Sequence, residues 1–152
     1  MSPSLNALVD TLIAAGEAMD FETWEAHIVK RLRAEIPHYK WVGFYWVDGE
    51  MLQLGAWDGP EATEHVRIPV GEGICGLAAR TKETVIVDDV NERNEYLACF
   101  PYTRSEIVVP ILRDGEAIGE IDIDGDEIGA FKEVDKAELE KLAQAVAKKY
   151  HR

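Results

Sequence analysis

The sequence has few cysteines, little positive charge and no long hydrophobic run, and each shortage excludes a class of protein. Its two cysteines, Cys75 and Cys99, are too few for a disulfide scaffold. It has 16 Lys and Arg against 29 Asp and Glu, and this net charge of −13 disfavours nucleic acid and anionic membrane partners. No apolar run reaches the roughly 18 residues of a membrane span, and the N-terminus lacks the basic start of a signal peptide. We therefore expect a cytoplasmic protein.

Hydrophobic patterning predicts one α+β domain over residues 1–152. Apolar residues recur at helical spacing within residues 1–37 and again within 133–150. Residues 39–131 hold two hairpin patterns, whose strands flank Asp48-Gly49 and Asp114-Gly115. Consecutive hairpins indicate an antiparallel sheet, and hence the α+β class. Two shorter strands, a short helix and a long loop are expected between the hairpins, at "VRIPV", "TVIVDDV", "ICGLAART" and residues 91–104 respectively.

Three glycines spell a phosphate-binding signature in an unsuitable context. Gly71, Gly73 and Gly76 match G-x-G-x-x-G, which needs a parallel βαβ unit to hold a dinucleotide. Here the preceding strand is short and carries Pro69, and the surrounding strands pair as hairpins. We interpret the glycines as a tight connection into a short helix. Cys75 would lie at the start of that helix, where unpaired N–H groups favour a thiolate, although a small buried hydrophobe is the usual role of such a cysteine.

The run "IGEIDID" places Glu120, Asp122 and Asp124 on one face of a strand by alternation. Three such acids usually form a solvated face. A three-residue loop at 113–115 would instead set Glu106 opposite Asp122 and bring the acids together, and we predict this loop. Converging carboxylates repel one another, which raises at least one pKa and can keep one acid protonated near neutrality.

A divalent metal is a competing use of clustered acids. The run "DIDGDEIGAFKE" has Glu127 where a calcium loop needs its turn glycine. The four histidines show no spacing that forms a ligand set with the cysteines. We therefore expect no metal and no cofactor.

The second cysteine, Cys99, lies in "EYLACFPYTRSE" within the long irregular loop. Long loops in compact domains are often functional. Its neighbours Leu97, Ala98 and Phe100 are equally compatible with a packing role. Arg104 could stabilise a thiolate at position 99 if the loop folds back, so the residues alone leave both roles open.

Four segments together resemble the GAF-domain free methionine-(R)-sulfoxide reductases: "WVGFYW", "GEGICG", "ACFPYTRSEIVVP" and "GEIDID". The resemblance extends from about Trp41 to Phe131. It implies a GAF-like antiparallel sheet of five or six strands, with the terminal helices on one face. A short helix and the long loop would cover a pocket on the other face.

The resemblance also implies a role for individual residues. Cys99 matches the catalytic cysteine and Cys75 a resolving cysteine, which would form a disulfide that thioredoxin reduces. Many relatives carry a third cysteine, in a pattern like A-C-x-R-I, where this chain has His65. The implied substrate is free methionine sulfoxide, and a homodimer is a candidate assembly. The implied substrate-binding residues are Glu106, Asp122, Asp124, Trp41 and Tyr45.

Two other functions compete with a reductase. A GAF domain can bind a small molecule as a regulatory module without turnover, although an acidic pocket would repel a cyclic phosphate. A redox sensor could use a Cys75–Cys99 disulfide as a switch. Only turnover of free methionine-(R)-sulfoxide separates the reductase from both.

Overall fold

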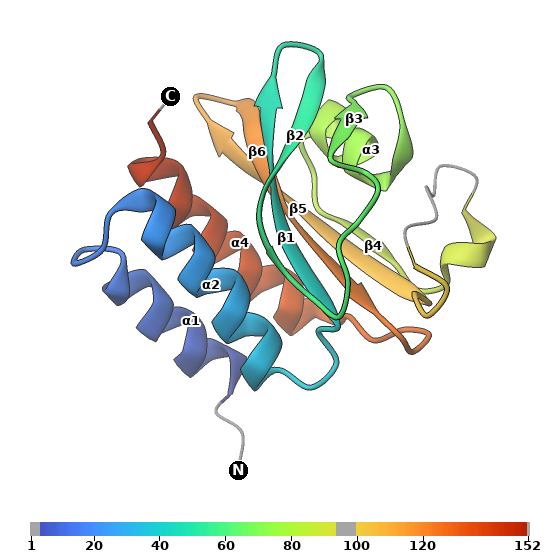
Figure 1. Ribbon diagram of the computed structural model, residues 1–152, viewed down its shortest axis with the longest axis horizontal. Coiled ribbons are helices and arrows are strands. Elements are labelled where there is room, and N and C mark those ends of the chain that lie inside the picture. The colour runs from blue at the N-terminus through green and yellow to red at the C-terminus, as the bar shows by residue number, and fades with distance from the viewer. Residues whose placement is uncertain (1–3, 94–99, 152) are drawn as a thin grey trace.

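In the part of the chain that the structure describes, six antiparallel strands form one sheet, with helices on both of its faces (Figure 1). The computed structural model describes residues 4–93 and 100–151. The strand order is β3-β2-β1-β6-β5-β4, which confirms the predicted α+β class and antiparallel sheet. In chain order the elements are α1 (Leu5–Ala15), α2 (Phe21–Glu35), β1 (Trp41–Asp48), β2 (Met51–Asp58), β3 (Arg67–Pro69), α3 (Gly73–Thr81), β4 (Val85–Val87), the 3-10 turn η1 (Val90–Glu92), β5 (Ser105–Arg113), β6 (Glu116–Gly125) and α4 (Glu133–Lys149).

The terminal helices α1, α2 and α4 cover one face of the sheet, and α3 lies on the other face (Figure 1). Side-chain caps help to start the first two helices, because Ser4 Oγ accepts from the Ala7 N–H and Asp20 Oδ1 from the Thr23 N–H. In the described part of the chain, none of the helices has the length and hydropathy of a membrane span.

Alternation along the central strands divides their side chains between two hydrophobic cores. On β6, Ile121 and Ile123 belong to the larger core, beneath the terminal helices. Trp41 and Tyr45 of β1 belong to the smaller core, with residues of α3. The smaller core is therefore the side of the sheet that receives the acids of β6.

The β5–β6 hairpin reaches its register in a way that differs from the prediction. The turn has two residues, Asp114 and Gly115, with φ of 52° and 79°, so the predicted three-residue loop is wrong. A bulge next to Ile111 then shifts the pairing by one residue, so that Glu106 lies opposite Asp124. The extra residue restores the even spacing that puts facing acids on one side of the sheet.

Candidate functional site

Four carboxylates, which we call the acidic cluster, lie on the α3 side of the sheet: Glu106, Glu120, Asp122 and Asp124. Asp122 and Asp124 pair with Gly43 and Trp41 of β1, and Glu120 pairs with Tyr45. The exposed fractions of the four acids are 5%, 0%, 4% and 2% in chain order. The acids therefore converge in a buried cluster, as predicted, and do not form a solvated face.

Cys75 faces this cluster from the first turn of α3. Gly73 begins the helix with φ of 70°, a conformation that favours glycine. A Cβ on Gly76 would come within 2.5 Å of the Val70 carbonyl oxygen, so only glycine lets the helix approach β3 so closely. These two glycines have the backbone role that we predicted, whereas Gly71 has open space around it.

The thiol and two of the carboxylates form a compact group. Sγ of Cys75 and carboxylate oxygens of Glu106 and Asp122 all lie within 4.8 Å of one another, and all three residues are buried. A cavity of about 20 Å³, roughly enough for one water molecule, opens between them. Its walls are Tyr45, Ile68, Gly73, Ile74, Cys75, Glu106 and Asp122.

The prediction of a thiolate at Cys75 is wrong for this conformation. Burial raises the pKa of the Cys75 thiol well above its usual value, and the negative charges of Asp122, Glu120 and Glu106 raise it further. Desolvation and these neighbouring charges thus raise the pKa of Cys75 by more than the helix N-terminus lowers it. The raised pKa therefore favours the protonated thiol at Cys75.

Burial also raises the pKa of the acids in the cluster. Desolvation is the main cause for Glu120, Asp122 and Asp124, and the charge of Asp122 adds to the effect at Asp124. The Thr103 hydroxyl acts in the opposite direction, since it donates a hydrogen bond of 3.0 Å to Asp124 Oδ2. The pKa of at least one acid of the cluster is therefore raised, as the sequence predicted.

Aromatic rings form a second part of the site. The Trp41 ring stacks on Trp57, with centroids 6.1 Å apart, and lies 6.0 Å from the ring of Phe100. The Tyr45 hydroxyl donates a 2.7 Å hydrogen bond to the carbonyl of His65. Trp41 and Tyr45 therefore lie on the face where the resemblance placed them.

Cys99 lies outside the described residues, and the Cys75–Cys99 approach stays a prediction. The next residue, Phe100, is buried and packs in the core that contains Cys75. Its ring stacks on Tyr102, with centroids 5.1 Å apart.

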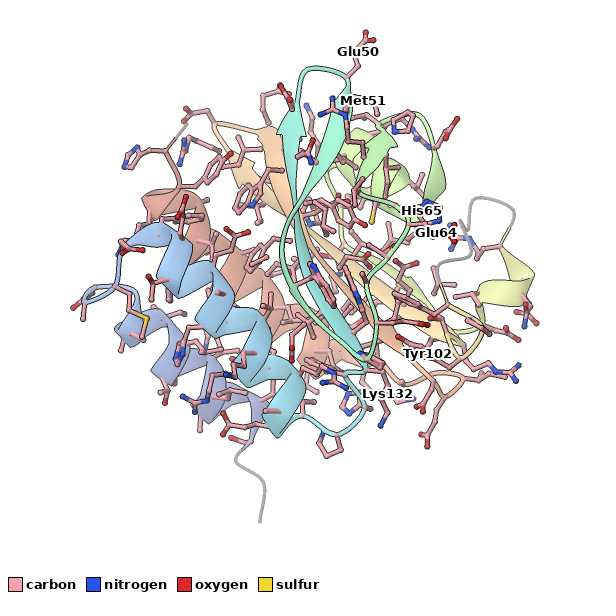
Figure 2. The ribbon with its side chains drawn as sticks, in the orientation of Figure 1. Glu50, Met51, Glu64, His65, Tyr102 and Lys132 are labelled. Atoms are coloured by element: carbon pink, nitrogen blue, oxygen red, sulfur yellow. The ribbon has the colours of Figure 1, made fainter. Side chains whose placement is uncertain are left out.

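The structure adds three residues to which sequence reasoning gave no role in the site: Glu120, Thr103 and His65. Alternation in "GEIDID" placed Glu120 on the correct face, but the sequence did not indicate that this side chain is buried. Figure 2 shows His65 on the segment between β2 and β3, on the α3 side of the sheet. The charge of His65 lowers the pKa of Asp122, which no sequence spacing indicates.

Glu120→Gln should make the stability of the protein less sensitive to pH. Because the folded-state pKa of Glu120 lies above its unfolded value of about 4.5, the folded state binds the extra proton. This contribution is complete below the unfolded pKa and is lost as the pH rises through the folded pKa. Between the two values, wild type should lose about 1.4 kcal/mol per pH unit relative to Glu120→Gln.

Urea unfolding across a pH series measures this difference. Glu127→Gln, at an exposed position just beyond the strand, is the matched control and should follow wild type. Parallel profiles for wild type and Glu120→Gln would contradict a raised pKa at Glu120.

Comparison with known proteins places the chain in a family. The GAF domain family matches residues 18–148. The free methionine-R-sulfoxide reductase of Saccharomyces cerevisiae is 44% identical over 80% of this chain and 67% of its own length. The type II free methionine-R-sulfoxide reductase structure from Thermoplasma acidophilum has 42% identity and a TM-score of 0.80, covering 85% of this chain and 94% of that one. The Neisseria meningitidis enzyme, solved with its substrate, has 33% identity and a TM-score of 0.89, covering 98% and 92%. The chain therefore belongs to the GAF domain family, within which it is similar to the free methionine-R-sulfoxide reductases.

Proposed function

We propose that this protein reduces free L-methionine-(R)-sulfoxide to methionine, with Cys99 as nucleophile, Cys75 as resolving cysteine and thioredoxin as reductant. The observation that carries the proposal is the buried acidic cluster, which faces Cys75 across a small cavity. Relatives at 44% and 33% identity are named for this activity, and one related structure holds its substrate. The predicted cytoplasmic location suits a thioredoxin-dependent enzyme.

The acidic cluster can bind two groups of the substrate, the sulfoxide oxygen and the ammonium. A protonated carboxyl can donate a hydrogen bond to the sulfoxide oxygen, and Asp122 is placed for this because it lines the cavity with a raised pKa. An ionised neighbour can bind the substrate ammonium. The indole N–H of Trp41 is buried with no acceptor among the described residues, so it can donate to the substrate carboxylate.

The proposed cycle balances without a cofactor. The Cys99 thiolate attacks the sulfoxide sulfur while a carboxyl proton goes to the oxygen; methionine leaves and Cys99 becomes a sulfenic acid. The Cys75 thiol then displaces water from that sulfenic acid and forms a disulfide. A thioredoxin dithiol reduces the disulfide by exchange. The net products are methionine, water and oxidised thioredoxin.

The cavity has to widen before the substrate can bind, since its volume of about 20 Å³ is far below that of an amino acid. Local movement of α3 or of the aromatic residues would provide this space. The same requirement applies to a sensor that binds a small metabolite in this place, so volume alone does not separate the two functions.

A turnover measurement separates the reductase from the small-molecule sensor. Thioredoxin-coupled NADPH oxidation should proceed with free methionine-(R)-sulfoxide and not with the (S) epimer or with the N-acetylated (R) compound. The N-acetylated compound fails because it lacks the ammonium that the acids bind. No turnover under conditions where a control reductase works would overturn the reductase and favour a sensor or switch. Equal rates with the N-acetylated compound would overturn the specificity for the free amino acid.

A further inference from the structure

The most unusual chemistry in the described residues is a thiol enclosed by carboxylates. Cys75, Glu106 and Asp122 each offer one possible ligand atom, and these three atoms lie within 4.8 Å of one another. Asp122 Oδ1 is buried with no hydrogen-bond partner among the described residues, although Asp122 lines the cavity. Such an orphaned acceptor is costly unless something else occupies the cavity.

Glu120 brings a further buried carboxyl group next to Cys75. Its side chain is fully buried, and its carboxyl group is hydrogen-bonded to the Cys75 thiol. A cation bound at the Cys75 sulfur would also be attracted to a carboxylate this close.

The donor set selects the type of cation. A thiolate with two carboxylate oxygens suits zinc, whereas calcium and magnesium take six or more oxygens. Zinc bonds of about 2.0–2.3 Å in a tetrahedron separate ligand atoms by about 3.3–3.7 Å. The three ligand atoms lie within 4.8 Å of one another, so side-chain rotation has to bring them closer, and the zinc ion itself would occupy the cavity of about 20 Å³.

We propose that the reduced protein binds one zinc ion through the Cys75 thiolate and one oxygen each of Glu106 and Asp122, and that bound zinc blocks the substrate pocket. The zinc–sulfur bond replaces the S–H bond of Cys75, and the proton of this thiol and any proton on Glu106 or Asp122 go to solvent with no change of oxidation state. Binding therefore strengthens as the pH rises. The ion neutralises the repulsion within the acidic cluster and withdraws Cys75 from disulfide exchange. The blocking step rests on the proposed function, whereas zinc binding does not.

The binding experiment uses the full reduced chain, zinc alone and a competing chromophoric chelator. Wild type should bind one zinc per chain. Cys75→Ser, Glu106→Gln and Asp122→Asn should each lose at least the roughly 10- to 100-fold in affinity that loss of even a supporting residue costs. Cys99→Ser and Asp126→Asn are matched controls, a second thiol and an exposed acid, and should bind as wild type does.

Cobalt substitution keeps the test decisive if a variant fails to fold. Cobalt bound by wild type should show a sulfur-to-cobalt charge-transfer band in the near ultraviolet, and Cys99→Ser should retain it. No zinc binding, binding that survives Cys75→Ser, or a band that depends on Cys99 would each overturn the site.

Activity is measured separately, first with a chelator and then with zinc. Inhibition that chelator reverses and that excess sulfoxide relieves supports the blocked pocket. Stoichiometric zinc without inhibition overturns the blocking step alone. No turnover even with chelator overturns the proposed reductase, while the zinc site is still judged by binding.

Discussion

Cys99→Ser is expected to abolish reduction of free methionine-(R)-sulfoxide, by on the order of 10³-fold or more in kcat/KM, as removal of a nucleophile does. A serine hydroxyl is far less nucleophilic toward the sulfoxide sulfur and cannot form the disulfide. Cys99→Ser should still bind the substrate, because the acidic cluster and Trp41 lie on strands that do not contain residue 99.

Cys75→Ser is the informative partner of that variant. It should still form about one equivalent of methionine per chain in the first turnover, because Cys99 remains, but should turn over poorly with thioredoxin. Rapid quench measures the first equivalent, and a sulfenic-acid trap should label only this variant after substrate is added. Full multiple turnover by Cys75→Ser would contradict its role as resolving cysteine, and activity of Cys99→Ser near the wild-type level would contradict the role of Cys99 as nucleophile.

Trp24→Ala should lower the free energy of unfolding by about 3–5 kcal/mol, the range for large aromatic truncations in a core. Trp24 is 2% exposed, and its indole N–H donates a 2.8 Å hydrogen bond to the Leu12 carbonyl. A Cβ on Gly16 would lie 2.6 Å from the ring, so the ring fills the space between α1 and α2. Removal leaves both a cavity and an unpaired carbonyl.

Urea unfolding followed by far-ultraviolet circular dichroism measures this loss. Trp57→Ala is the matched control, since Trp57 is 36% exposed. It should lower the free energy of unfolding by at most about 1 kcal/mol beyond the effect of an ordinary surface substitution. Trp24→Phe should fall between the two because it keeps most of the packing and loses the hydrogen bond. Equal losses for Trp24→Ala and Trp57→Ala would contradict the packing role.

Sequence patterning predicted most of the fold because it depends on local periods. Alternation in "GEIDID" separates Ile121 and Ile123 from the acids in any strand, whatever its neighbours. Helical spacing in residues 1–37 and 133–150 likewise determined which helices would pack on the sheet, and the hairpin dipeptides marked two of its turns.

The sequence by itself determined which residue types face the site, and only the tertiary structure decided their register, burial and charge. The two-residue turn alone would have paired Glu106 with Ile123, and one bulged residue set it opposite Asp124 instead. Cys75 begins a helix, as the glycines indicated, yet its pKa is raised because the sheet packs buried acids against it. Register and desolvation depend on distant segments, and no local pattern in the chain encodes either of them.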